Sequence, residues 1–177
     1  CRTIGGMKTF LIAALTADGF IARSSDHLAD WTSKEDKVFF TKRTKQAGVV
    51  VMGLNTYKTI GRPLGGRLNV VYAPATERLI GVELTQREPA DLLRHLESRG
   101  YKEVAIIGGS TIYTLFMKAG LIDTVYLTVE PLFFGEGLTL FADSLDARLK
   151  LRKVKKMRED AILLEYQVKK ETNDTRD

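Results

Sequence analysis

A carboxylate set among aromatic residues is the feature of this sequence that most suggests chemistry. On a helix, Asp36 would share one face with Phe39, Phe40 and Arg43, at spacings of three, four and seven residues. Burial beside two phenylalanines would disfavour the ionised form and raise the pKa of Asp36. Such a carboxyl group could bind a ring nitrogen, or help to protonate it, near neutral pH. The alternative is an acid favoured in the first helical turn by the helix dipole.

The neighbouring acid, Glu35, competes with Asp36 for this role. Glu35 lies three residues after Thr32, which is the spacing of a capping box at a helix N-terminus. We therefore assign Glu35 to the helix cap and Asp36 to the candidate site.

Two strand-like runs end in glycine and lead directly into helix-like segments. The first turn contains Gly53 and the second contains Gly108 and Gly109. A helix N-terminus offers free N–H groups to an anion, and glycine allows a phosphate to approach the backbone closely. On neighbouring parallel strands, the two turns could hold both phosphates of a dinucleotide, with help from the hydroxyls of Thr56 and Ser110. The alternatives are glycines that serve backbone geometry and hydroxyls that cap helices.

The remaining polar residues offer no competing catalytic set. His27 and His95 have no partner at a recognisable spacing, Cys1 is the single cysteine, and no spacing typical of metal ligands occurs. We therefore expect no bound metal and no internal disulfide. Hydride transfer from a cofactor needs no protein nucleophile, so it is compatible with a sequence that offers no recognisable nucleophile or metal ligands.

Strand and helix signals alternate along the chain. We expect strands at residues 8–15, 48–52, 68–73, 81–85, 103–107 and 124–130, helices at 33–47, 55–60, 88–99 and 110–119, and a closing hairpin at about 147–157 and 160–169. Residues 16–31 are expected to form a long loop. This order predicts a three-layer α/β/α fold, with a mostly parallel central sheet and an antiparallel C-terminal hairpin.

Length and composition indicate one folded domain. Of the 177 residues, 44% are hydrophobic and 28% are charged. We expect the domain to span residues 7–170, residues 1–6 to precede it, and residues 171–177 to form a disordered tail. No apolar run is long enough to span a bilayer. We therefore expect no membrane partner, a cytoplasmic protein, and a monomer or homodimer.

The net charge of +5 would suit an anionic partner, and much of it lies in residues 148–158. There the basic residues alternate with Leu149, Leu151 and Val154. We favour the solvated face of an edge strand, where lysines discourage aggregation, over a nucleic-acid site. A non-catalytic basic binding module remains the least favoured of three functional hypotheses, because the stretch has no aromatic residues for base stacking.

Five motifs occur in the order and spacing of a known family. They are LIAALTADGFIA (residues 11–22), VMGLNTY (51–57), IGRPLGGR (60–67), IIGGSTIY (106–113) and VYLT (125–128). With these motifs the chain resembles the dihydrofolate reductases over residues 7–141. The resemblance implies reduction of 7,8-dihydrofolate to 5,6,7,8-tetrahydrofolate by hydride from NADPH, with NADH as a possible substitute. It also implies that water delivers the proton to the ring.

The resemblance also assigns roles to individual residues. Asp36 would grip the pterin ring, Thr128 would hydrogen-bond to it, and Trp31 would end the mobile loop over the nicotinamide. Arg67 would hold the α-carboxylate of the glutamate tail. The substrate would be surrounded by Ile12, Ala13, Asp36, Phe40, Arg67, Ile107 and Thr128. The cofactor would be surrounded by Ala14, Ile21, Gly53, Asn55, Thr56, Gly108, Gly109, Ser110, Thr111 and Tyr113.

Some positions depart from the family pattern. Leu54 stands where a basic residue often contacts the 2′-phosphate of NADPH, and Ala73 and Pro74 replace hydroxyl residues that bind the same phosphate. Gly65 replaces a usual proline. The segment EPLFFGEGLTLF (residues 130–141) resembles instead the pyrimidine reductases of riboflavin synthesis, which share the fold and the cofactor. A reductase of that kind, or another NAD(P)H-dependent reductase of a small ring, is therefore the alternative function.

Overall fold

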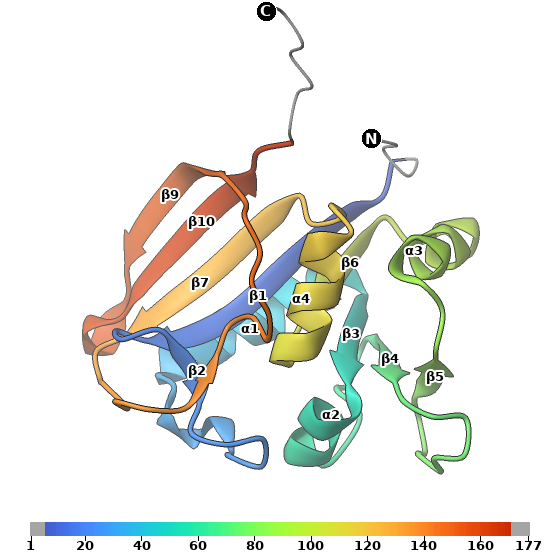
Figure 1. Ribbon diagram of the computed structural model, residues 1–177, viewed down its shortest axis with the longest axis horizontal. Helices are drawn as coiled ribbons and strands as arrows, with labels where there is room; N and C mark the ends of the chain where they lie inside the picture. Colours follow the sequence, from blue (N-terminus) through green and yellow to red (C-terminus); the bar gives the residue numbers. More distant parts are fainter. Residues whose placement is uncertain (1–5, 171–177) are drawn as a thin grey trace, which may run out of the picture.

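The computed structural model describes residues 6–170, so the expectations for residues 1–5 and 171–177 lie outside the described residues. Eight strands form one twisted sheet in the order β5-β4-β3-β6-β1-β7-β10-β9 (Figure 1). Their bounds are β1 Lys8–Thr16, β3 Val49–Gly53, β4 Leu68–Tyr72, β5 Glu83–Thr85, β6 Glu103–Ile106, β7 Thr124–Glu130, β9 Leu149–Lys156 and β10 Ile162–Val168.

The pairing confirms the predicted topology. The six strands from β5 to β7 are mutually parallel, whereas β10 runs antiparallel to both β7 and β9. The basic stretch forms β9 and lies at one end of the sheet, so its predicted place as an edge strand is also confirmed.

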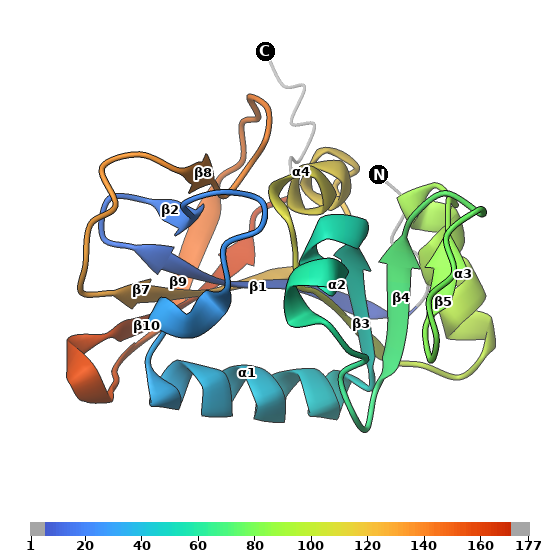
Figure 2. The same ribbon diagram turned by 90° about the horizontal axis from the view of Figure 1, so that it is seen from below.

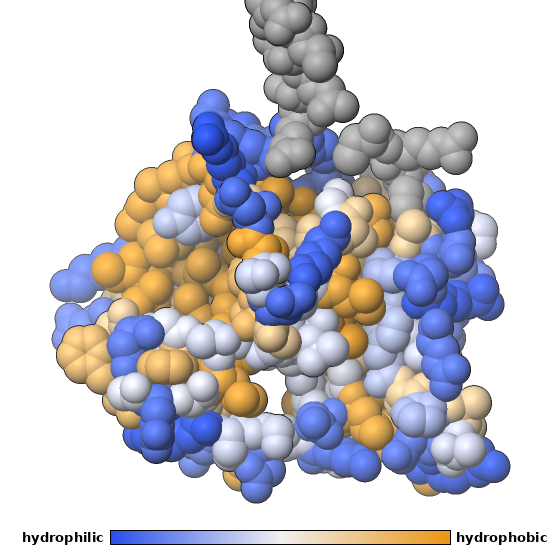
Figure 3. Space-filling model, viewed as in Figure 1, coloured by the Kyte–Doolittle hydropathy of each residue, from blue (hydrophilic) through white to orange (hydrophobic). Residues whose placement is uncertain are grey.

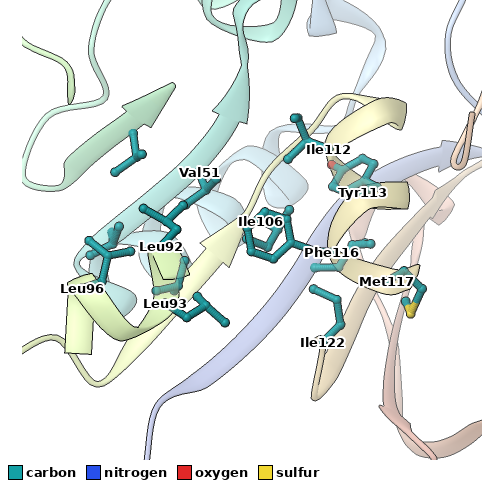
Figure 4. Close-up of a cluster of buried hydrophobic side chains, with 14 of the residues drawn as sticks. Val51, Leu92, Leu93, Leu96, Ile106, Ile112, Tyr113, Phe116, Met117 and Ile122 are labelled. Carbon is teal, nitrogen blue, oxygen red and sulfur yellow. The ribbon is translucent and has the colours of Figure 1, made fainter. Parts of the chain in front are cut away.

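Helices cover both faces of the sheet, which completes the three layers (Figure 2). On one face, α1 (Lys34–Ala47) and α2 (Leu54–Ile60) enclose a core that includes Phe10 and Met52. On the other face, α3 (Pro89–Ser98) and α4 (Ser110–Lys118) enclose a second core with Phe116 and Ile122 (Figure 4).

The central strand β3 explains why the sheet needs two helical layers. Val49 and Val51 point into the core beneath α3 and α4, and Val50 and Met52 point into the core beneath α1 and α2. All four side chains are fully buried. An uninterrupted apolar run is what a strand covered on both faces requires.

A small second sheet lies in the segment that the sequence analysis treated as a loop. The strand β2 (Phe20–Ala22) pairs antiparallel with β8 (Leu138–Thr139), and a short 3₁₀ helix covers Ala29–Trp31. The interpretation of residues 16–31 as loop throughout is therefore wrong. These strands have three and two residues, which is too short to produce a recognisable periodic pattern.

Candidate active site

Asp36 lies in the first turn of α1, where the helix N-terminus meets the end of β7. The helix is capped by Ser33, whose hydroxyl accepts a hydrogen bond from the backbone N–H of Asp36 (3.2 Å). The side chain is buried, with 9% of its surface exposed. Burial raises the pKa of Asp36, hydrogen bonds from Thr128 and Thr32 oppose the shift, and the nearby negative charge of Glu130 adds to it. The predicted direction of the pKa shift is thus confirmed.

Glu130 is a buried acid beside Asp36 that the sequence analysis missed. Its carboxylate is 2% exposed and accepts hydrogen bonds from the backbone N–H of Ser33 (2.8 Å) and from the Ser33 hydroxyl (2.9 Å). Glu130 therefore holds the N-terminus of α1 against the end of β7. The sequence could have indicated Glu130, because it is the one acidic residue in VYLTVE (residues 125–130), a strand that otherwise has apolar and hydroxyl-bearing side chains.

The predicted capping box of Glu35 is wrong. The Glu35 carboxylate instead accepts hydrogen bonds from the backbone N–H of Arg158 and from Lys155 Nζ (3.2 Å). The cap residue is Ser33 and not Thr32. The third helical residue, which closes a capping box, is therefore Asp36 and not Glu35. The carboxylate that hydrogen-bonds to the cap residue Ser33 is that of Glu130, at the end of β7.

Of the other residues expected on the Asp36 face of α1, Phe39 and Arg43 contact the strands of the sheet, and Phe40 contacts the core beneath α1 and α2. Phe39 packs edge-to-face with Tyr126 of β7, with ring centroids 5.6 Å apart. Arg43 forms two hydrogen bonds with Glu103 (2.8 and 3.0 Å) and lies over the ring of Phe10. Both residues thus attach α1 to the sheet. Phe40 is half-buried and contacts the core beneath α1 and α2.

Arg67 lies against the far end of α1. Its Nη1 donates to the hydroxyl of Thr44 (2.6 Å) and its Nε donates to the carbonyl oxygen of Gly65 (3.1 Å). Burial lowers the pKa of Arg67. Within residues 6–170, no carboxylate forms an ion pair with this guanidinium. Arg67 thus keeps hydrogen-bonding capacity for an external anion.

Asp36, Phe40 and Thr44 follow one another at intervals of four residues, so they lie along one side of α1. Eight helical residues correspond to about 12 Å of axial rise. Asp36 and Thr44, whose hydroxyl accepts the hydrogen bond from Arg67, are therefore about 12 Å apart along the helix axis. The structure places a buried acid at one end of this line and a cation at the other.

The two glycine turns meet at the carboxyl ends of adjacent strands. The strands β3 and β6 pair directly, and the N–H of Gly53 donates to the carbonyl oxygen of Gly108 (2.8 Å). Gly108 has φ +125° and the Gly108–Gly109 peptide is cis. A Cβ on Gly109 would meet only the hydroxyl oxygen of Thr56, at 3.4 Å. The predicted juxtaposition of the two turns is confirmed.

The hydroxyl residues of these turns do not cap their helices. Neither α2 nor α4 has a side-chain cap, and the Ser110 hydroxyl donates to the carbonyl oxygen of Thr139 in β8 (2.6 Å). The capping alternative is therefore wrong for Thr56 and Ser110. Asn55 and Thr111 occupy the first turns of α2 and α4, and both are exposed.

Tyr113 links the glycine turns to the acid. It is buried in α4, and its hydroxyl donates to the carbonyl oxygen of Ile12 in β1 (2.7 Å). Burial and the negative charge of Asp36 both raise the pKa of Tyr113 far above its ordinary value, so it stays protonated. The hydrogen bond fixes α4 against the strand that runs between the two halves of the site.

The strand β1 presents its candidate residues alternately to the two faces. Ile12 belongs with Ile107 to the core on the α1 side, whereas Ala13 packs into the core on the α4 side. Ala14 points to the same face as Ile12 and pairs with Thr128 of β7. A ligand on the α1 side can therefore reach Ala13 only through its backbone.

Trp31 and the segment around it are held by residues 131–137. The rings of Trp31 and Phe134 pack edge-to-face, with their centroids 5.1 Å apart. The guanidinium of Arg23 also lies over the Phe134 ring, 4.1 Å from its centre. Asp18 accepts hydrogen bonds from the N–H groups of Gly135 (2.7 Å) and Phe134 (3.2 Å). Ile21 lies half-buried in β2. The space-filling view shows a gap in the surface between this region and α2 (Figure 3).

Among residues 6–170, no three His, Cys, Asp or Glu side chains are grouped so that they could hold a metal ion. No helix in the same range has the length and apolar character needed to cross a membrane.

Comparison with known proteins places the chain in a family. The family model described as dihydrofolate reductase matches residues 8–169. The chain belongs to the dihydrofolate reductase family. It is 35% identical over 123 residues to dihydrofolate reductase type 3 of Salmonella typhimurium, a match that covers 69% of this chain and 71% of that protein. The chain is accordingly an oxidoreductase with a small-molecule substrate.

Solved structures confirm the fold. A pyrimidine reductase-like protein from Corynebacterium diphtheriae superposes with a TM-score of 0.76 at 18% identity, covering 93% of each chain. RibD from Acinetobacter baumannii superposes with a TM-score of 0.77 at 20% identity, covering 94% of this chain and 59% of that chain. The fold of this family member is thus shared with a pyrimidine reductase-like protein and with RibD.

Proposed function

We propose that the protein reduces 7,8-dihydrofolate to 5,6,7,8-tetrahydrofolate with NADPH. The observation that carries the proposal is the line along α1 from the buried Asp36 to the guanidinium of Arg67. Dihydrofolate has a ring with an amino group and ring nitrogens at one end and a glutamate carboxylate at the other. The spacing and the chemistry of the two residues match these two ends.

Each residue of this line would have a separate task. Asp36 accepts hydrogen bonds from the ring's amino group and the adjacent ring nitrogen, and Thr128 and Thr32 hold its carboxylate in place. Phe40 packs against the body of the substrate. Arg67 binds the α-carboxylate through two parallel hydrogen bonds, a geometry that lysine cannot reproduce.

The glycine turns fit the phosphates of a dinucleotide. A side chain at Gly108 or Gly109 would project toward the hydroxyl of Thr56, so glycine keeps this cradle open. The first N–H groups of α4 are free to donate to a phosphate. When bound, NADPH supplies the hydride. Ala14, Ile21 and Tyr113 would line the nicotinamide end, and Trp31 would exclude water from it.

The raised pKa of Asp36 is consistent with this task. A carboxyl group that resists ionisation can exchange a proton with the ring or with water near neutral pH. We assign the delivery of the proton to the ring nitrogen to water, with Asp36 as the group that holds the ring and tunes its basicity. The reaction then needs no nucleophile from the protein.

A pyrimidine reductase activity is the second candidate, because residues 131–137 hold the Trp31 region through Phe134 and Asp18. This segment is the part of the sequence that resembles the riboflavin-type enzymes. Its place beside the proposed nicotinamide end could shape the pocket for a smaller ring that carries a ribosyl group.

The test measures NADPH oxidation with dihydrofolate, with a tailless dihydropterin and with a ribosylamino-pyrimidine. We expect turnover with dihydrofolate, and we expect Arg67→Lys to raise KM for it by about 5- to 150-fold, the equivalent of about 1–3 kcal/mol. The tailless pterin should hardly respond to this substitution. Turnover with the pyrimidine and none with dihydrofolate would transfer the assignment to the second candidate.

A further inference from the structure

One face of the sheet is apolar and lacks a helical cover. On the side of α4, the outer strands present an open face made of Leu149, Leu151, Val154, Ile162, Leu164, Tyr166, Leu127 and Val129. Leu149, Leu151, Val154 and Ile162 are 37%, 51%, 56% and 40% exposed. In the space-filling view this face forms a continuous hydrophobic surface over β9 and β10 (Figure 3).

The register shows that these residues share one side of the sheet. Leu151 pairs with Tyr166, which pairs with Val125, and Val154 pairs with Leu164, which pairs with Leu127. Directly paired residues point to the same face. Since Val125 and Leu127 belong to the core beneath α4, the open face is the continuation of that core. Leu140, Phe141 and Leu145 pack against that core.

Three lysines of β9 lie on the opposite side. Lys150, Lys153 and Lys155 pair with Gln167, Glu165 and Leu163, which alternate with the residues of the open face. Lys155 forms an ion pair with Glu35 of α1 (3.2 Å), which confirms that these cations face the α1 side. Lys156, the last residue of the strand, pairs with Ile162 at the margin of the open face and forms an ion pair with Asp160 (3.6 Å). Lys150, Lys153 and Lys155 are thus separated from the apolar side chains of the strand, and only its last residue, Lys156, lies at the edge of the apolar side.

The open face has the size of the apolar patches that mark interaction sites on soluble proteins. Its three strands, β9, β10 and β7, lie about 4.8 Å apart, and about seven residues at about 3.3 Å per residue give roughly 330 Å² before the relief of the side chains is counted. Contiguous apolar patches above a few hundred Å² mark interaction sites. Two such faces would bury about 660 Å² of this flat area, and the relief of the side chains brings the buried surface toward the roughly 1,000 Å² at which specific protein–protein interfaces begin.

We propose that the open face packs against the same face of a second copy of this chain, so that the protein forms a two-fold symmetric dimer. A flat apolar sheet is complementary to itself, and two sheets pack face to face about 10 Å apart. The segment 171–177, ETNDTRD, has no apolar side chain with which to cover it.

The charge distribution favours this partner over others. Pairing of two β9 edges would set lysines opposite lysines, which destabilises an edge-to-edge dimer. Attachment to an anionic membrane needs apolar and cationic groups on one side, whereas β9 presents Lys150, Lys153 and Lys155 on the side opposite its apolar residues. Face-to-face packing leaves these three lysines outside the interface and Lys156 at its rim.

The experiment is sedimentation velocity of the full chain from about 1 to 100 µM, the range in which interfaces of this size associate. We expect the mass of two chains at the upper end. The double variant Leu151→Glu/Val154→Glu should sediment as a monomer, because it would bury four carboxylates in the interface. The matched variant Lys150→Glu/Lys153→Glu changes the other side of the same strand and should remain a dimer.

Circular dichroism and thermal unfolding show whether each variant is folded. A wild-type protein that is monomeric at about 100 µM overturns the proposal, whatever the variants do. A dimer that survives Leu151→Glu/Val154→Glu, or one that is lost only in Lys150→Glu/Lys153→Glu, also overturns it. If Leu151→Glu/Val154→Glu does not fold, Leu151→Ser alone should weaken the wild-type dimerisation constant by at least tenfold, and an unchanged constant overturns the proposal.

Discussion

The two halves of the candidate site are built in different ways. The glycine turns use backbone groups of two adjacent strands and the helices that follow them, so their geometry follows from short sequence motifs. The acid half uses side chains of Ser33, Asp36, Thr128 and Glu130, which meet because α1 begins where β7 ends. The first half depends on the absence of side chains, and the second depends on a buried network of charges and hydroxyls.

This difference leads to opposite expectations for stability and function. Substitutions in the acid half remove a buried charge that burial makes costly, so they can lower activity without lowering stability. Substitutions in the glycine half add atoms, and their effect depends on the backbone conformation at each glycine. The following predictions test the comparison in order of expected effect.

Asp36→Asn should have the largest effect on catalysis. We expect turnover of dihydrofolate to fall ~10²-fold or more at neutral pH, since electrostatic and proton-transfer contributions of one group have this size. NADPH affinity should be unchanged in a fluorescence titration. If Glu35→Gln is the damaging change and Asp36→Asn is mild, the assignment of the acid is wrong.

The same variant should be at least as stable as the wild type at pH 7. The pKa of Asp36 is raised in the folded state, so that state binds more protons than the unfolded chain between the two pKa values. The stability contribution of Asp36 therefore falls as pH rises through this window. Asparagine removes this dependence. A Tm at pH 7 well below that of the wild type would show that the ionised carboxylate stabilises the fold.

The two glycines of the second turn should respond differently to alanine. Gly109→Ala should leave the Tm nearly unchanged, because φ is −84° and the added Cβ meets only Thr56. It should weaken NADPH binding by about tenfold, the equivalent of about 1.4 kcal/mol. Gly108→Ala is the matched control and should lower the Tm, because φ is +125° there. Unchanged cofactor affinity in folded Gly109→Ala would reduce this turn to a structural role.

Glu130→Gln should shift the pH dependence of the reaction without abolishing it. The negative charge of Glu130 contributes to the raised pKa of Asp36, so its removal should lower that pKa. The limb of the kcat/KM profile that reports Asp36 should move to lower pH. Glutamine can still accept the hydrogen bond from the Ser33 N–H, which preserves the cap. Glu35→Gln is the control, and an equal shift in both variants would contradict the role given to Glu130.

Discrimination between NADPH and NADH should show the smallest effect. Leu54, Ala73 and Pro74 offer no charge to a 2′-phosphate, and a lost charged hydrogen bond is worth about 1.5–3 kcal/mol. We expect a weak preference in the ratio of kcat/KM values. Arg78 is exposed near this region, and its guanidinium donates only to backbone carbonyls of its own turn. A steep NADPH preference that survives Arg78→Ala would show that another residue contacts the phosphate.

The sequence by itself determined the helices and strands of the main sheet and their order. Continuous apolar runs such as VVVM and the amphipathic segment of α3 depend on local periodicity, which a chain displays wherever it folds. The alternation of strand and helix restricts the topology to a mostly parallel sheet, because parallel strands need crossover connections. The two glycine turns and the burial of Asp36 followed from the same local patterns.

Only the tertiary structure decided the contacts between distant segments. The hydrogen bonds from Ser33 to Glu130 join residues 97 positions apart, and the local alternative, Glu35, has the correct spacing for the same task. The pairing of β2 with β8 and the anchoring of Arg67 on Thr44 likewise leave no periodic signal. Side-chain partners of this kind depend on which surfaces the packed sheet and helices bring together, and a local pattern cannot encode that choice.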